Sequence, residues 1–210
     1  MRKKKQQLLT FKVITLGESG VGKTSLLRRY IENEFDENTI ATIGLSFSLK
    51  LVTLKNNEKI QLKLIDTGGQ EKYRALAKSY FKNADAVLFI YAKDNKNSFD
   101  NIKEWILLFN ENHNGKIGIP QFLVETKGDL KRVVDENRSK KFAKENNLNF
   151  HQTSSKNDEN SINKLFQEIC ELLYENHIKN YRGSKQNNIQ LKQYRQTKNS
   201  NCCLFRVEEE

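Results

Sequence analysis

The stretch that decides the fold lies near the start of the chain and reads Gly17-Glu18-Ser19-Gly20-Val21-Gly22-Lys23-Thr24. Residues 11–16 before it are rich in strand-forming side chains, and residues 25–31 after it have the apolar spacing of a helix. A glycine-rich loop between a strand and a helix lets backbone N–H groups surround phosphate oxygens at the positive end of the helix dipole. We therefore predict a phosphate-binding loop in which Lys23 reaches the outer phosphates and the Thr24 hydroxyl binds Mg²⁺.

The composition is typical of one soluble domain with a polar tail. The chain has 210 residues, 37% of them hydrophobic, and a formal net charge of +10. That charge is compatible with a membrane surface or a nucleic acid as partner. Three cysteines and the lack of an apolar leader predict a reducing, cytosolic setting. The longest apolar run, residues 86–92, is too short to span a bilayer.

Strand and helix patterns alternate after the first loop, which predicts a mostly parallel sheet with helices on both faces. Two alternating segments, residues 46–54 and 59–66, flank the turn signal Asn56-Asn57 and predict a hairpin, hence one antiparallel edge strand. The expected fold class is α/β, a P-loop NTPase with a six-stranded sheet. The predicted parts of the chain are a basic N-terminal arm (residues 1–7), a globular domain (residues 8–177) and a disordered, variable tail (residues 178–210).

A second polar segment follows the third predicted strand and reads Asp66-Thr67-Gly68-Gly69-Gln70-Glu71. A carboxylate at Asp66 can hold Mg²⁺ through a water, since Mg²⁺ keeps several waters and takes few carboxylates. The backbone N–H of Gly69 can approach a terminal phosphate, and Gln70 can orient an attacking water. Standing alone, the segment would be better explained as a polar glycine turn.

Here the chain resembles a Ras-like small GTPase, most closely of the Rab branch, in which this loop reads D-T-A-G-Q-E. The resemblance covers essentially the first 175 residues. Upstream, residues 39–44 look like the first switch segment, which implies that Thr42 binds Mg²⁺ and senses the γ-phosphate. Residues 43–47 are similar to the Rab stretch I-G-V-D-F, and several such motifs occur in the family's order.

Two later loops are predicted to recognise the base. Thr126-Lys127-Gly128-Asp129 stands where the family has N-K-x-D, and a carboxylate at Asp129 can accept two hydrogen bonds that guanine offers and adenine does not. The stem of Lys127 can pack along the base. Residues 153–156 resemble the family's S-A-K loop, which adds Ser154, Ser155 and Lys156 to the candidate binding residues. Each loop by itself could be a surface turn. The remaining candidates in the first loop are Glu18, Ser19, Gly20, Val21, Gly22 and Ser25.

Four departures from the family pattern stand out. Thr126 replaces an asparagine that braces the base loop, and its one hydroxyl cannot copy both amide functions. Thr39 stands where an aromatic residue usually covers the nucleotide, and Gly68 replaces alanine and should loosen the segment after it. Cys202-Cys203 resembles the Rab lipidation pair. However, further residues follow the pair, and the fourth residue from the end is Val207, so no C-a-a-X box is present.

The resemblance implies a Mg²⁺-dependent switch that binds GTP and GDP, hydrolyses GTP slowly and acts in vesicle traffic. Its implied partners are a guanine nucleotide exchange factor, a GTPase-activating protein and effectors that contact the two switch segments. The implied form is a monomer at the cytoplasmic face of an endomembrane, attached through the tail at Cys202 and Cys203. A nucleotide-bound scaffold without turnover is the alternative. A nucleic-acid-binding module ranks last, because the tail has no recognised motif, and no nucleic acid partner is expected.

Overall fold

The computed structural model describes residues 8–37, 42, 44–68, 79–115 and 118–201, and it places six strands in one sheet. The strand order is β2-β3-β1-β4-β5-β6. Only β2 and β3 pair antiparallel, whereas every other neighbouring pair is parallel, as predicted. The strands are β1 (Leu9–Leu16), β2 (Leu45–Thr53), β3 (Lys59–Thr67), β4 (Ala86–Ala92), β5 (Gln121–Thr126) and β6 (Asn149–Gln152).

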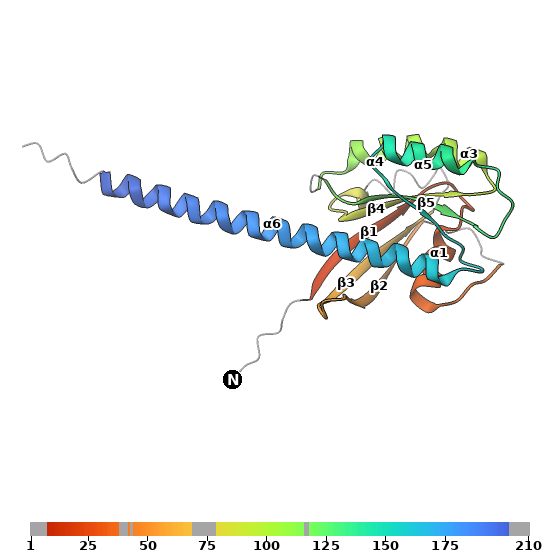
Figure 1. The fold of residues 1–210 in the computed structure, drawn as a ribbon, viewed down its shortest axis with the longest axis horizontal. Coiled ribbons are helices and arrows are strands. Elements are labelled where there is room, and N and C mark those ends of the chain that lie inside the picture. Colours follow the sequence, from red (N-terminus) through yellow and green to blue (C-terminus); the bar gives the residue numbers. More distant parts are fainter. Residues whose placement is uncertain (1–7, 38–41, 43, 69–78, 116–117, 202–210) are drawn as a thin grey trace, which may run out of the picture. The chain divides into compact units, whose positions relative to one another are not determined.

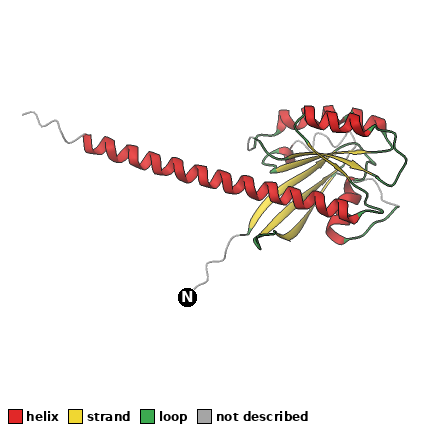
Figure 2. Cartoon of the chain, viewed as in Figure 1, coloured by secondary structure: helices red, strands yellow, loops and turns green. Residues whose placement is uncertain are grey.

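Helices cover both faces of the sheet (Figures 1 and 2). One face carries α3 (Lys96–Asp100), α4 (Ile102–Asn112) and α5 (Glu136–Glu145). The other face carries α1 (Lys23–Glu32) and the first part of α6 (Glu159–Asn201). On that face the Tyr30 ring of α1 stacks on the Phe166 ring of α6, with ring centroids 3.7 Å apart. The predicted α/β class is therefore confirmed.

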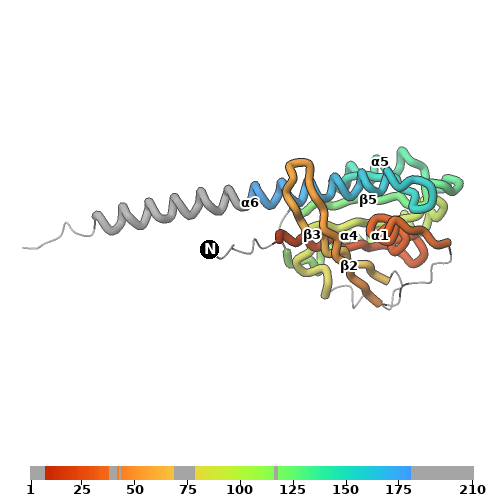
Figure 3. The backbone as a smooth tube through the Cα atoms, turned by 90° about the horizontal axis from the view of Figure 1, so that it is seen from below, coloured from red at the N-terminus to blue at the C-terminus, as the bar shows by residue number. Residues whose placement is uncertain are grey.

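The predicted hairpin is also present, and Figure 3 shows the backbone turning from β2 into β3. Asn57 adopts the left-handed conformation, with φ 64°, at the tip of this turn. The backbone N–H of Leu54 donates to the carbonyl of Glu58, which closes the turn. Asparagine tolerates positive φ better than most residues, so the turn signal in the sequence has a direct structural cause.

The middle of the sheet is apolar on both faces, which fixes where the core lies. Every residue of β4 is buried, as expected for a central parallel strand with helices on both sides. Phe99, Trp105 and Phe109 pack onto it from α3 and α4. The parallel strands therefore end together, and the loops after β1, β3, β5 and β6 share one edge of the sheet.

The last helix differs from the sequence prediction. The structure continues α6 to Asn201, whereas the sequence predicts disorder from residue 178. A scarcity of apolar residues argues against packing but not against helical backbone, and this segment is rich in lysine, glutamine and arginine and has no proline. The chain divides into two units, with the boundary between Leu173 and Tyr174. Among the helices that the structure describes, none is long and apolar enough to cross a membrane.

Candidate functional site

A cavity of about 480 Å³ lies at the carboxyl ends of the strands, where the predicted loops converge. Residues of the first glycine loop and of both base loops line it, together with Thr42. The predicted residues in its wall are Ser19, Gly20, Gly22, Lys23, Thr24, Ser25, Thr42, Thr126, Lys127, Asp129, Ser155 and Lys156.

The glycine loop needs two of its glycines for geometric reasons. A Cβ on Gly17 would lie 2.1 Å from the carbonyl oxygen of Ile90, so no side chain fits there. Gly22 caps α1 with φ 95°, a left-handed conformation that favours glycine. No side chain accepts a hydrogen bond at this cap. The first N–H groups of α1 are therefore available to an anion in the cavity.

Lys23 crosses the base of the glycine loop as a buried cation. Its side chain is only 5% exposed, and Nζ donates to the carbonyl oxygens of Gly17 (2.9 Å) and Glu18 (2.7 Å). Burial lowers the pKa of Lys23 to about 8, and the nearby charges of Asp66 and Glu18 offset this only in part. A phosphate group beside Nζ would supply the missing negative charge. Lys23 thus suits a phosphate ligand.

Three oxygen-bearing side chains meet near the end of β3, where two of them, Thr24 and Thr42, line the cavity. The Thr24 hydroxyl donates to Oδ2 of Asp66 at 2.6 Å and lies 2.7 Å from the Thr42 hydroxyl. The other carboxylate oxygen of Asp66, Oδ1, is buried and has no hydrogen-bond partner among the described residues. Burial raises the pKa of Asp66, while the hydrogen bond from Thr24 and the charge of Lys23 oppose that rise. Two hydroxyls and one carboxylate with a spare oxygen fit Mg²⁺, which prefers oxygen ligands.

Hydrogen bonds connect the two base loops to each other. Ser154 donates from Oγ to Oδ1 of Asp129 at 2.5 Å, which orients that carboxylate. The backbone N–H of Gly128 donates to the carbonyl of Thr153. Lys127 has φ 55°, a left-handed conformation. Asp129 can therefore present its second oxygen to a ligand.

Thr126 links the base loop to the glycine loop. Its hydroxyl lies 2.5 Å from the carbonyl oxygen of Val21 and 2.9 Å from that of Tyr91. A hydroxyl has one proton, so it cannot satisfy both carbonyls with a full hydrogen bond at once. The contact between the base loop and the glycine loop, which the replacement of asparagine is expected to weaken, is therefore present. It depends on the single Thr126 hydroxyl, which is shared between two carbonyl oxygens.

Four described residues among the predicted binding residues do not line the cavity, namely Glu18, Val21, Asp66 and Ser154. The Glu18 side chain points to α4, where Oε1 accepts from Trp105 Nε1 at 3.1 Å and from Asn101 Nδ2 at 3.4 Å. Val21 faces the core, so it contributes only backbone groups. Ser154 acts through Asp129. Gly69, Gln70, Thr39, Cys202, Cys203 and the predicted arm (residues 1–7) lie outside the described residues.

The cavity wall also contains residues that the sequence analysis missed, namely Phe35, Asp36, Glu37, Thr67 and Leu130. Phe35 and Leu130 offer apolar surface to a planar ring. Lys156 pairs with Glu37, so the second base loop is joined to the segment after α1. A lone phenylalanine in the polar run of residues 32–37 was the available signal.

A phosphate-binding loop, a Mg²⁺ donor set and a base loop around one cavity define a P-loop nucleotide-binding protein. The model of the Ras family matches residues 12–175. The chain is 41% identical to the Ras-related protein Rab-11B of Dictyostelium discoideum, over 79% of this chain and 76% of that protein. It is 34% identical to the Ras-related protein SEC4 of Saccharomyces cerevisiae, over 91% and 90% respectively. The GTP-binding protein ypt3 of Schizosaccharomyces pombe is 38% identical, over 76% and 73%. The chain belongs to the Ras family and, within it, to the Rab branch of small GTPases.

Proposed function

We propose that this GTPase is a guanine-nucleotide switch of membrane traffic, with GTP or GDP in the cavity at the strand ends. One observation carries the proposal: Thr24, Thr42 and Asp129 line one cavity, and the Thr24 hydroxyl donates a hydrogen bond to Asp66 beside it. The first three residues suit Mg²⁺ and phosphate, whereas Asp129 suits the donor edge of guanine. One residue of the first switch segment, Thr42, is therefore also a ligand for the Mg²⁺ and phosphate of the nucleotide.

The roles of the described residues follow from their positions. Lys23 and the free N–H groups at the start of α1 hold the phosphates. Thr24, Thr42 and Asp66 would hold Mg²⁺, which when bound neutralises phosphate charge. Thr42 is the only one of these three that comes from the first switch segment, so it can report whether a γ-phosphate is present.

We assign hydrolysis of the terminal phosphate to attack by a water that Gln70 orients, as the loop D-T-G-G-Q-E implies. Phosphoryl transfer is catalysed mainly by positioning and by electrostatic stabilisation. A neutral amide can therefore orient the water, because it can accept one hydrogen bond and donate another. Gly69 is assigned a backbone hydrogen bond to the γ-phosphate.

Replacing Gln70 with leucine should slow hydrolysis of bound GTP, because leucine cannot orient water. The parent rate is expected on the order of 10⁻⁴ s⁻¹, by analogy with Ras. Single-turnover hydrolysis of preloaded GTP measures both rates. Gln167→Leu on the exposed face of α6 is the matched control and should keep the parent rate. An unchanged rate in Gln70→Leu would assign catalysis elsewhere, and a parent without any hydrolysis would favour the scaffold alternative.

We further propose that the protein works as a monomer with three kinds of partner, namely an exchange factor, an activating protein and effectors. The side chain of Thr42 contacts that of Thr24, so occupancy of the cavity bears directly on Thr42. That coupling supports effector binding to the switch segments. No role in binding nucleic acid is proposed.

The tail is proposed to attach the protein to the cytoplasmic face of an endomembrane through Cys202 and Cys203. Two lipid chains, or one chain with a basic segment, give stable anchoring where a single short chain does not. We expect the parent to float with membranes and a Cys202→Ser, Cys203→Ser variant to remain soluble. Flotation measures the attachment, and mass spectrometry of the cysteine-containing peptides measures the modification, with the peptide of the buried Cys170 as the internal unmodified control. A parent that stays soluble with an unmodified peptide would contradict the anchor.

A further inference from the structure

Glu125, the residue directly before the base loop, is a fully buried carboxylate. It lies at the end of β5, and its side chain is 1% exposed. Arg132 donates two hydrogen bonds to this carboxylate, from Nη2 to Oε1 at 2.8 Å and from Nη1 to Oε2 at 2.9 Å. Bidentate arginine–carboxylate pairs of this kind are strong and geometrically specific. The pair therefore joins the two ends of the loop that carries Lys127 and Asp129.

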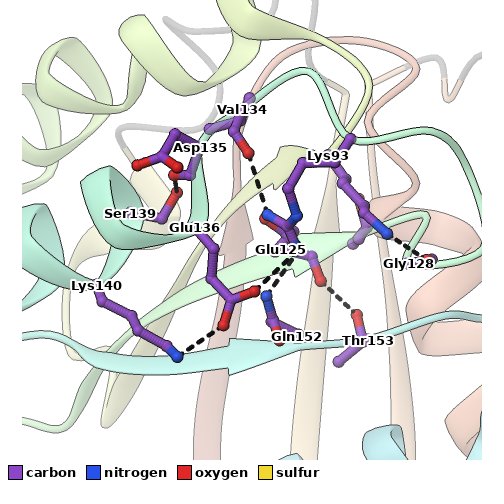
Figure 4. A network of polar contacts seen from close by, with 12 residues as sticks. Lys93, Glu125, Gly128, Val134, Asp135, Glu136, Ser139, Lys140, Gln152 and Thr153 are labelled. Carbon is purple, nitrogen blue, oxygen red and sulfur yellow. Dashed lines mark hydrogen bonds and ion pairs between the residues drawn. The ribbon is translucent and has the colours of Figure 1, made fainter.

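The same residue also reaches the second base loop (Figure 4). Gln152 at the end of β6 donates from Nε2 to Oε1 of Glu125 at 3.2 Å. The carbonyl oxygen of Glu125 accepts from the Thr153 backbone N–H at 2.7 Å and from the Thr153 hydroxyl at 2.9 Å. Glu125 and Gln152 are paired across β5 and β6, and each directly precedes one of the two base loops.

Burial makes the Glu125–Arg132 pair costly to break. A buried carboxylate that loses its partner is strongly destabilised, so Glu125 holds Arg132 in place. Tyr91 adds a hydrogen bond from its hydroxyl to Oε2 at 2.8 Å. Lys93 donates to the carbonyl of Gly128 at 2.6 Å, which fixes the middle of the loop from the same side. By contrast, the link from this loop to the glycine loop rests on the one hydroxyl of Thr126.

We propose that the Glu125–Arg132 pair positions the two base loops, and thereby sets how strictly guanine is selected and how long the nucleotide stays bound. Both residues are positioning residues, since neither lines the nucleotide cavity. They act through Asp129, whose carboxylate must meet two donors on the base at once. The inference rests on the proposed function, in which Asp129 binds guanine.

The test compares the parent with Glu125→Gln, which keeps the side-chain shape but removes the charge. Release of fluorescent GDP should be at least tenfold faster, because losing a hydrogen bond between the base and a charged carboxylate costs on the order of tenfold or more in affinity. The preference for GDP over IDP, which lacks the 2-amino group that Asp129 would accept from, should fall as well. Single-turnover hydrolysis of GTP that remains bound should stay within about twofold of the parent, since the phosphate contacts are untouched.

Two further variants keep the test decisive. Arg132→Lys retains the charge on a partly exposed side chain but cannot form the bidentate pair. Its GDP release rate and its GDP-to-IDP preference should lie between those of the parent and of Glu125→Gln. Ile60→Val, in the core at the start of β3, supplies a general loss of stability far from the loops. It should leave the GDP-to-IDP preference unchanged.

The possible outcomes distinguish the positioning role of the Glu125–Arg132 pair from the proposed binding of guanine nucleotides. A parent that does not bind GDP overturns both. A parent that binds GDP, with folded Glu125→Gln or Arg132→Lys protein that keeps the parent's release rate and preference, overturns the positioning role alone. A change in release rate equal to that of Ile60→Val, without a change in preference, also overturns it and reduces the pair to general stabilisation.

Discussion

Replacing Asp129 with alanine should remove most of the preference for guanine over adenine nucleotides. In the parent, that preference is expected to be about four orders of magnitude, because a site built to hydrogen-bond a particular edge rejects a ligand that lacks it. Asp129 lies in the cavity wall, and Ser154 orients its carboxylate through a 2.5 Å hydrogen bond. Competition of GDP and ADP against a bound fluorescent nucleotide measures the preference.

Two control variants sharpen this result. Asp129→Asn keeps the size of the side chain but faces two donors of guanine with one acceptor, so it should also lose most of the preference. Asp100→Ala removes an aspartate that pairs with Arg138 on the surface, and it should behave like the parent. If ADP displaced GDP from the parent at similar concentrations, Asp129 could not be the residue that selects the base.

Local sequence patterns predicted much of this fold. The glycine loop, the hairpin turn at Asn56-Asn57 and the buried run of residues 86–92 are each decided by neighbours in the chain. The sequence also predicted that Thr24 and Asp66 serve one Mg²⁺ at the strand ends, and Oγ1 of Thr24 lies 2.6 Å from Oδ2 of Asp66. The apolar spacing of residues 99–109 continues across Asn101, so it does not reveal the break between α3 and α4 there.

Contacts between distant loops could not be predicted in the same way. Phe35 belongs to no periodic segment, so only the folded loop shows that it lines the cavity. Glu18 lies within the phosphate-binding motif, yet its side chain turns to Trp105. The pairing of Glu125 with Arg132 depends on how the intervening loop closes, which no spacing rule specifies. The residue types therefore predicted the kind of ligand, whereas only the tertiary structure shows which side chains form hydrogen bonds and ion pairs with one another.

Removing the charge of Asp66 should weaken the hold on Mg²⁺ and, through it, on the nucleotide. Oδ2 of Asp66 accepts from Thr24, which leaves Oδ1 buried and without a hydrogen-bond partner among the described residues. A buried charged oxygen in that state is stabilised by a cation or by a water bound to one. Asp66→Asn keeps the shape and removes this charge.

We expect Asp66→Asn to need about 10- to 100-fold more Mg²⁺ than the parent to protect bound GDP from release, which is the usual effect of losing a group that supports a metal site. Dissociation of fluorescent GDP over a Mg²⁺ titration measures the requirement. Excess EDTA is the control, because parent and variant should then release GDP at similar rates. A variant with the parent's Mg²⁺ requirement would show that Asp66 does not support the ion. A difference that persists undiminished in EDTA would instead mean that Asp66 acts on the loop itself, through the hydrogen bond from Thr24.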